Sequence, residues 1–260
     1  MIYFPVLRMR RLTVQLRELS IGESIKIASM PVHLEEAANT AMLRYAVESV
    51  KGKDIIEDPA HWTVQERIMT VGHYLASTSV DDPNFQIGNT SRYLDYLDGG
   101  NDAAVMVSTI LAGEVGGDIW HIRHLTGAMA ESIERLNGEV DGISGRLHWL
   151  IGGMAAQMTI EGDNSPSPID GEGKFDQFLV DRMKVMAGYP ESDFNALLML
   201  YFAGREKLSH LFHIEFDNTG IVLLPKGGAA SNLPPARFPV SSCLTKIALD
   251  LVRVAHEPGI

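Results

Sequence analysis

The chain has 260 residues and a net charge of −11, with 45% hydrophobic and 21% charged residues. This composition is typical of a globular protein and excludes a disordered or fibrous one. The acidic balance disfavours nucleic-acid binding, and no apolar run reaches the roughly 20 residues that cross a bilayer. One dense basic cluster is interpreted as a solvated strand face or a subunit contact: Arg8, Arg10, Arg11 and Arg17.

Strands and helices are expected at the N-terminal end of the chain. Residues 2–7 and 12–19 are predicted strands, the second because apolar and polar residues alternate in LTVQLREL. Ser20 and Glu23 match the S-x-x-E capping box, which begins a helix. A second helix is expected over 33–50, where the apolar residues keep helical spacing.

Four further segments in the middle of the chain carry signals of regular structure. A second capping box, TVQE, begins a helix expected over 63–77. The apolar run 103–113 fits either a helix or a buried strand. After a pair of glycines, the spacing of large apolar residues predicts a helix over 119–136, and another is expected near 144–158.

The segment 161–173, EGDNSPSPIDGEG, has the composition of a linker. It divides the chain into a predicted N-terminal α+β lobe, residues 1–160, and a C-terminal helical lobe, residues 174–260. The second lobe is expected to hold a β-hairpin in IEFDNTGIVLLP, an extended Pro/Gly arm over 225–240, and helices over 174–187, 192–212 and 241–255. The expected fold class is α+β, mainly helical, with an N-terminal strand region and a C-terminal β-hairpin.

Histidine is the residue type whose spacing suggests chemistry. His121 and His124 are three residues apart, as are His210 and His213. On a helix each pair would share a face and offer two metal ligands. Neither pair matches H-E-x-x-H, and no third ligand is indicated, so helix-end or surface histidines are the favoured interpretation.

Other catalytic signatures are missing from the sequence. The single cysteine, Cys243, excludes an internal disulfide and the usual cysteine zinc sites, and is interpreted as a small buried hydrophobe. GEVGGD lacks the lysine of a phosphate loop, and GISGR is not the nucleophile elbow G-x-S-x-G. We therefore expect no enzyme, with no catalytic, cofactor-binding or metal-binding residues and no cofactor.

A resemblance to a known class of proteins lies in three stretches: LTVQLRELSIGESIKIA, TVQERIMTVGHYLAS and DFNALLMLYFAGREKLSHLFHIEFDNTGIVLLP. They are similar to proteins encoded among the tail genes of tailed bacteriophages and prophages, of the tail or baseplate assembly type. The resemblance implies a structural component of the virion, assembled in the host cytoplasm. Its partners would be other tail or baseplate proteins and copies of itself, contacted within a large oligomer.

Two alternatives stay open beside the tail component. One is a tail assembly chaperone that leaves before the particle is complete, and the other is a metal-dependent hydrolase that uses the histidine pairs. For a tail component, the predicted subunit contacts are the N-terminal strand and the arm 225–240. The strand would pair with a neighbouring sheet, and the prolines of the arm would lower the entropy cost of docking in an extended form.

Overall fold

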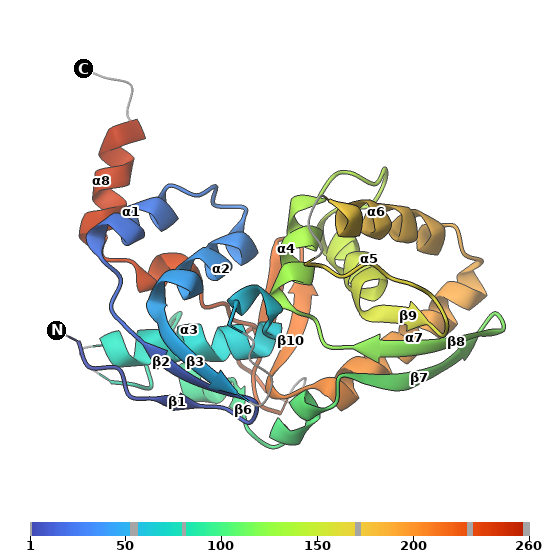
Figure 1. The fold of residues 1–260 in the computed structure, drawn as a ribbon, viewed down its shortest axis with the longest axis horizontal. Coiled ribbons are helices and arrows are strands. Elements are labelled where there is room, and N and C mark those ends of the chain that lie inside the picture. The colour runs from blue at the N-terminus through green and yellow to red at the C-terminus, as the bar shows by residue number, and fades with distance from the viewer. Residues whose placement is uncertain (1, 53–56, 80–81, 170–172, 228–230, 257–260) are drawn as a thin grey trace.

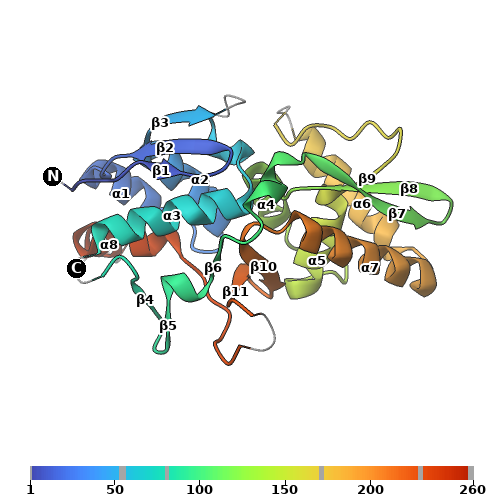
Figure 2. The ribbon, with the colours of Figure 1, turned by 90° about the horizontal axis from the view of Figure 1, so that it is seen from below.

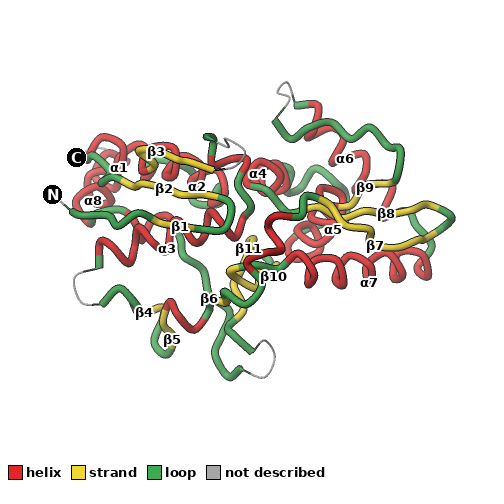
Figure 3. Tube along the Cα trace, turned by 60° about the horizontal axis from the view of Figure 1, so that its bottom comes forward, coloured by secondary structure: helices red, strands yellow, loops and turns green. Residues whose placement is uncertain are grey.

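The computed structural model describes residues 2–52, 57–79, 82–169, 173–227 and 231–256. Its fold is α+β, with eight α-helices in this part of the chain and small antiparallel sheets. The elements form two lobes side by side, with a short sheet between them (Figure 1). Figure 3 shows helices, strands and loops in both lobes.

The first lobe contains an antiparallel sheet of order β1-β2-β3, formed by Leu7–Arg8, Leu12–Leu16 and Val47–Gly52. The alternation predicted for β2 is confirmed, because its first, third and fifth residues are buried. Four helices accompany the sheet: α1 (Ile21–Ala28), α2 (Glu35–Ala46), α3 (Val64–Thr78) and α8 (Lys246–His256). Both predicted capping boxes are present, at the starts of α1 and α3.

The strand β2 is internal to its sheet. It pairs with β1 on one side and with β3 on the other, so both of its edges are already hydrogen-bonded. β2 therefore has no free edge for the pairing with a neighbouring subunit that the sequence analysis predicted. The open edges of the sheet belong to β1 and β3.

The largest departure from the sequence expectation is at the start of the predicted helix 119–136. The structure has a strand there, β8 (Asp118–Arg123), which pairs with β7 (Thr109–Val115). The pair Gly116-Gly117 makes the two-residue turn, with φ of 66° and 88°, which glycine adopts without steric cost. The helix prediction was wrong for these residues because Trp120 and Ile122 alternate as buried strand residues.

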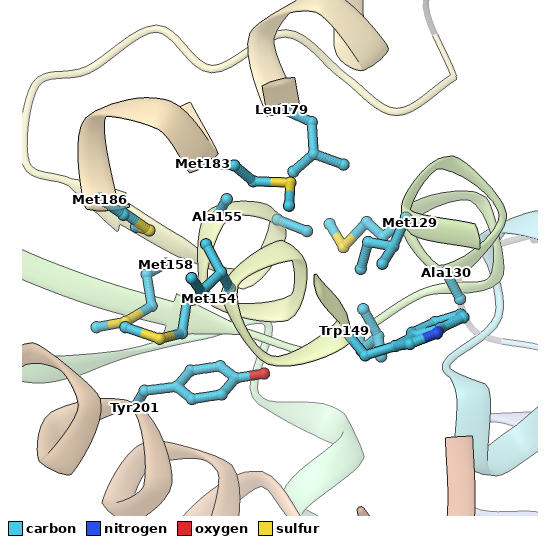
Figure 4. Packing of buried hydrophobic residues seen from close by; sticks show 14 of the residues in the cluster. Met129, Ala130, Trp149, Met154, Ala155, Met158, Leu179, Met183, Met186 and Tyr201 are labelled. Carbon is cyan, nitrogen blue, oxygen red and sulfur yellow. The ribbon is translucent and has the colours of Figure 1, made fainter. Parts of the chain in front are cut away.

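The second lobe combines the sheet β7-β8-β9 with four helices. Its remaining elements are α4 (Gly127–Arg135), α5 (Gly145–Gln157), β9 (Met158–Ile160), α6 (Lys174–Ala187) and α7 (Glu191–Leu208). Figure 4 shows α5, which carries Trp149 and Met154, packed against Met129 of α4, Met183 and Met186 of α6 and Tyr201 of α7. The glycines of α5 permit this packing, since a Cβ at Gly153 would lie 2.5 Å from the Tyr201 hydroxyl.

A third sheet, of order β11-β10-β6, lies between the lobes. It contains β6 (Leu97–Asp98), β10 (Leu211–Asp217) and β11 (Gly220–Leu224). A small hairpin, β4 (Gln86–Ile87) with β5 (Ser91–Arg92), projects from the first lobe (Figure 2). Short 3-10 turns complete the described chain: η1 (Pro59–His61), η2 (Tyr93–Asp95), η3 (Asp102–Met106) and η5 (Val240–Cys243).

The predicted arm 225–240 packs on its own chain over most of its described length; residues 228–230 lie outside the described residues. Ala236 pairs with Leu223 of β11, and the Tyr96 hydroxyl donates to the Pro234 carbonyl at 2.7 Å. Phe238 is buried in the core of the first lobe. Ala236 and Phe238 therefore anchor the arm within its own chain, which is a different role from the subunit contact expected of the arm.

The hydrophobic cores also divide the chain differently from the predicted lobes. One core joins residues of β8, α4 and α5 to residues of α6 and α7, on both sides of the segment 161–173. The other core joins N-terminal residues to Phe238, Val240 and Cys243. Residues 170–172 lie outside the described residues, and the rest of that segment connects β9 to α6 within the second lobe.

Candidate functional site

Polar side chains gather where the two lobes meet, at the N-terminus of α3. Thr63 and Glu66 form the capping box, and Arg11 reaches them from the turn between β1 and β2. The Arg11 guanidinium binds both oxygens of Glu66, with Nε–Oε1 at 3.0 Å and Nη2–Oε2 at 2.5 Å. The Glu66 side chain is 1% exposed. Removing one partner from such a buried pair typically costs about 3–5 kcal/mol, so the pair fixes the β1–β2 turn to α3.

His210 bonds to this group from the end of α7. Its Nδ1 lies 2.9 Å from the Leu208 carbonyl oxygen, which only accepts, so Nδ1 carries the proton. Its Nε2 therefore accepts from the Thr63 hydroxyl at 3.0 Å. Burial lowers the pKa of His210, which keeps this imidazole neutral near pH 7.

His124 packs against His210 from the segment after β8. The two rings meet edge to face, with centroids 5.0 Å apart. The Nε2 of His124 donates to the carbonyls of Ala104 and Val107, at 3.1 and 3.0 Å. Burial, and then the neighbouring His210, lower the pKa of His124 to about 4. Both imidazoles are therefore neutral groups whose N–H bonds are held by backbone carbonyls.

The structure brings together one histidine from each predicted pair and separates the pairs themselves. His121 lies on β8, and His213 lies on β10 with its Nε2 3.2 Å from the Asp98 carboxylate. Neither pair shares a helix face, because the predicted helices end or begin elsewhere. Within the described ranges, His, Cys, Asp and Glu side chains form no group of three placed to hold a metal ion. Cys243 is buried, which raises the pKa of its thiol.

A strained turn positions His210. Leu211 has a φ of 59° and is the one non-glycine residue with positive φ in the described part of the chain. The Phe212 N–H donates to the His210 carbonyl at 2.5 Å, which closes a three-residue turn. Such a conformation costs on the order of 1–3 kcal/mol and persists where surrounding contacts determine it. Here one such contact is the pairing of Leu211 and Phe212 of β10 with Asp98 and Leu97 of β6.

A second buried polar group joins α4 to the first lobe. The N-cap residue of α2, Leu34, makes no side-chain capping bond, and Glu134 of α4 supplies a cap instead. Its carboxylate accepts the backbone N–H groups of Glu36 and Ala37, at 2.8 and 3.2 Å. Burial raises the pKa of Glu134 to about 7, although these two bonds oppose the shift.

Arg67 of α3 supplies the positive charge of this second group, and its side chain is 2% exposed. Its Nη2 donates to the Glu36 carbonyl at 2.6 Å and to the Thr40 hydroxyl at 3.0 Å. Its Nη1 lies 3.3 Å from the Glu36 carboxylate. Sequence patterns gave no signal for this group, because its members come from three helices.

Three cavities, of about 260, 310 and 270 Å³, lie around His124 and His210. The first is lined by charged residues of both signs, including Arg205 and Glu215, which are 3.2 Å apart. The second is lined by arginine, histidine and hydroxyl side chains together with apolar residues, and the third mainly by polar groups near Asp98.

The buried hydrogen bonds of Glu134 and His210 link elements of one lobe to elements of the other.

No protein-family model, curated protein or solved structure matches this chain. A function for the chain is therefore inferred from its own residues. None of the described helices combines the length and the apolar composition that crossing a membrane requires.

Proposed function

We propose that this protein is a structural component of a bacteriophage tail or baseplate and acts through protein–protein contacts. The observation that supports the proposal is an uncovered apolar face on α8. This helix packs on α1, and its Ala248 is fully buried. Ile247 and Leu251 lie one turn apart on another face and are 67% and 49% exposed.

An exposed apolar stripe on a helix is a typical docking element. Such a helix binds by laying residues one turn apart into a groove of its partner. Burying one isoleucine or leucine side chain contributes roughly 1.5–3 kcal/mol, so two of them supply a substantial part of a stable contact. The helix lies at the outer end of the first lobe, beside α1, where a partner has room to approach (Figure 1).

The interior of the junction is consistent with a rigid building block. The buried histidines bond to backbone carbonyls, and the ion pairs of Arg11 and Arg67 link separate elements. The resemblance of three sequence stretches to tail proteins supplies the type of assembly. On this proposal the partners are other tail or baseplate proteins and copies of the chain, the protein resides in the virion after assembly in the host cytoplasm, and the role needs no catalytic turnover.

A pair of variants tests the role of α8 in a phage or inducible prophage that carries the gene. The double variant Ile247→Asp, Leu251→Asp places charges on the exposed stripe, and we expect a folded protein that is not incorporated into particles. The control is Val185→Asp on α6, where an equally exposed apolar residue, at 57%, lies on the other lobe. Incorporation of both variants at the wild-type level would contradict the docking role of α8.

A further inference from the structure

One cavity at the junction is lined by basic side chains, of which Arg123 carries an unbalanced charge among the described residues, in an otherwise acidic protein. It has a volume of about 310 Å³ and lies between the β1–β2 turn and the start of α4. Its lining contains two arginines and two histidines, and also the hydroxyl groups of three further residues. No carboxylate is among the described residues that line it, although the chain carries a net charge of −11.

The two arginines of this cavity differ in how their charge is balanced. Arg11 is neutralised by its bidentate pair with Glu66. Arg123, on β8, donates from Nε and Nη2 to the Ala156 carbonyl at 3.2 and 3.1 Å. In the part of the chain that the structure describes, no carboxylate lies within ion-pair distance of Arg123, and its Nη1 makes no hydrogen bond.

The surroundings increase the positive potential at Arg123. Burial lowers the pKa of Arg123, and the positive charge of Arg182 lowers it further. A half-buried guanidinium without a counter-charge is unfavourable in a medium of low dielectric constant. An anion in the cavity would supply the missing counter-charge.

The start of α4 places further hydrogen-bond donors in the lining of the cavity that contains Arg123. Thr126 is the N-cap residue of this nine-residue helix, and its hydroxyl makes no capping bond. Ser108, just before β7, contributes an exposed hydroxyl to the lining. The N-terminal end of a helix carries a partial positive charge that favours bound anions. The buried side chains of Val105 and Met129 give the cavity an apolar wall.

We propose that this cavity binds a phosphate group, with Arg123 as its ion-pair partner and the hydroxyls of Ser108 and Thr126 as hydrogen-bond donors. Guanidinium and hydroxyl donors around a helix N-terminus match the charge and the several oxygen acceptors of a phosphate group. The volume exceeds that of the free ion and lies at the lower end of small-molecule sites. The phosphate therefore comes either as the free ion or as a small phosphate monoester, whose organic part would contact the apolar wall. This inference is independent of the assembly role.

Isothermal titration of the full chain with inorganic phosphate and with phenyl phosphate, at constant ionic strength, tests the proposal. We expect saturable binding to the wild type, at a dissociation constant below about 1 mM, and at least tenfold weaker binding to Arg123→Gln. The control Arg146→Gln removes an arginine of α5 that is 65% exposed, and should bind as the wild type does. Tighter binding of phenyl phosphate identifies a monoester site, and equal or weaker binding identifies a site for the free ion.

A second variant and a mapping measurement cover the case in which Arg123→Gln does not fold. Ser108→Ala changes an exposed side chain and should weaken binding at least about threefold. In the wild type, phosphate should shift the amide resonances of residues 108 and 126–128. The proposal is overturned by the absence of saturable binding up to about 10 mM, by unchanged affinity in a folded Arg123→Gln variant, or by shifts confined to other regions.

Discussion

Replacing Gly127 by alanine should weaken the junction between the lobes. A Cβ at this position would lie 2.8 Å from Cζ and 2.9 Å from Cδ of Arg67, and closer still to Nη1. The guanidinium would have to move away from the Glu36 carboxylate, which is 3.3 Å from Nη1. Separating a buried ion pair costs about 3–5 kcal/mol, and the higher helix propensity of alanine offsets about 1 kcal/mol. We expect a loss of about 2–4 kcal/mol in the free energy of unfolding.

Urea denaturation followed by circular dichroism measures this loss. In an Arg67→Met background the guanidinium is absent, so Gly127→Ala should cost less than about 1 kcal/mol there. The matched control is Gly22→Ala in α1, where a Cβ meets nothing within 4 Å and the change should be neutral or stabilising. A loss below about 0.5 kcal/mol for Gly127→Ala, or equal losses in both backgrounds, would refute the reasoning.

Three further predictions concern stability. Between pH 6.5 and 8 the free energy of unfolding of the wild type should fall by at most about 0.8 kcal/mol relative to that of Glu134→Gln, because folding raises the pKa of Glu134 from 4.5 to about 7 and the folded state holds the extra proton. Thermal melts of the two proteins across this range measure the difference. Burial lowers the pKa values of His124, His148 and His210, which makes stability rise with pH equally in both proteins, so this contribution cancels in the comparison. Ile122→Ala should cost about 2–5 kcal/mol in urea titrations, since the side chain is fully buried against Gly204 of α7, and a cost below about 0.5 kcal/mol would contradict that packing. Deleting residues 1–17 should abolish cooperative unfolding, because it removes the central strand of the first sheet, and a native-like melt of that deletion would contradict the topology.

Local signals in the sequence predicted the elements whose causes are local. Two capping boxes placed the starts of α1 and α3, since the bonds between Ser20 and Glu23, and between Thr63 and Glu66, span three residues. The failed helix at 119–123 shows the limit of apolar spacing as a signal. Ile119 and Ile122, three positions apart, fit a helical stripe that continues through Leu125, but the two glycines before them form the turn of a hairpin.

The polar groups of the junction had no sequence signature because their members are distant in the chain. Glu134 caps a helix that begins about 100 residues earlier, at a backbone site where α2 lacks its own cap. His124 and His210 meet because β8 and α7 both end at the same side of the second lobe. Histidine spacing along the chain suggested other pairs, and nothing in that spacing distinguished contact across the fold from contact along a helix.

Quantitative mass spectrometry of purified particles tests the central claim most directly. The particles would come from a phage or induced prophage that carries the gene, freed of soluble protein on a density gradient. A structural component should be present in a fixed ratio to the major tail proteins, and the double variant at Ile247 and Leu251 should be missing from the same fraction. Absence of the wild-type protein from finished particles, with abundant protein in the lysate, would contradict a structural role and favour an assembly chaperone.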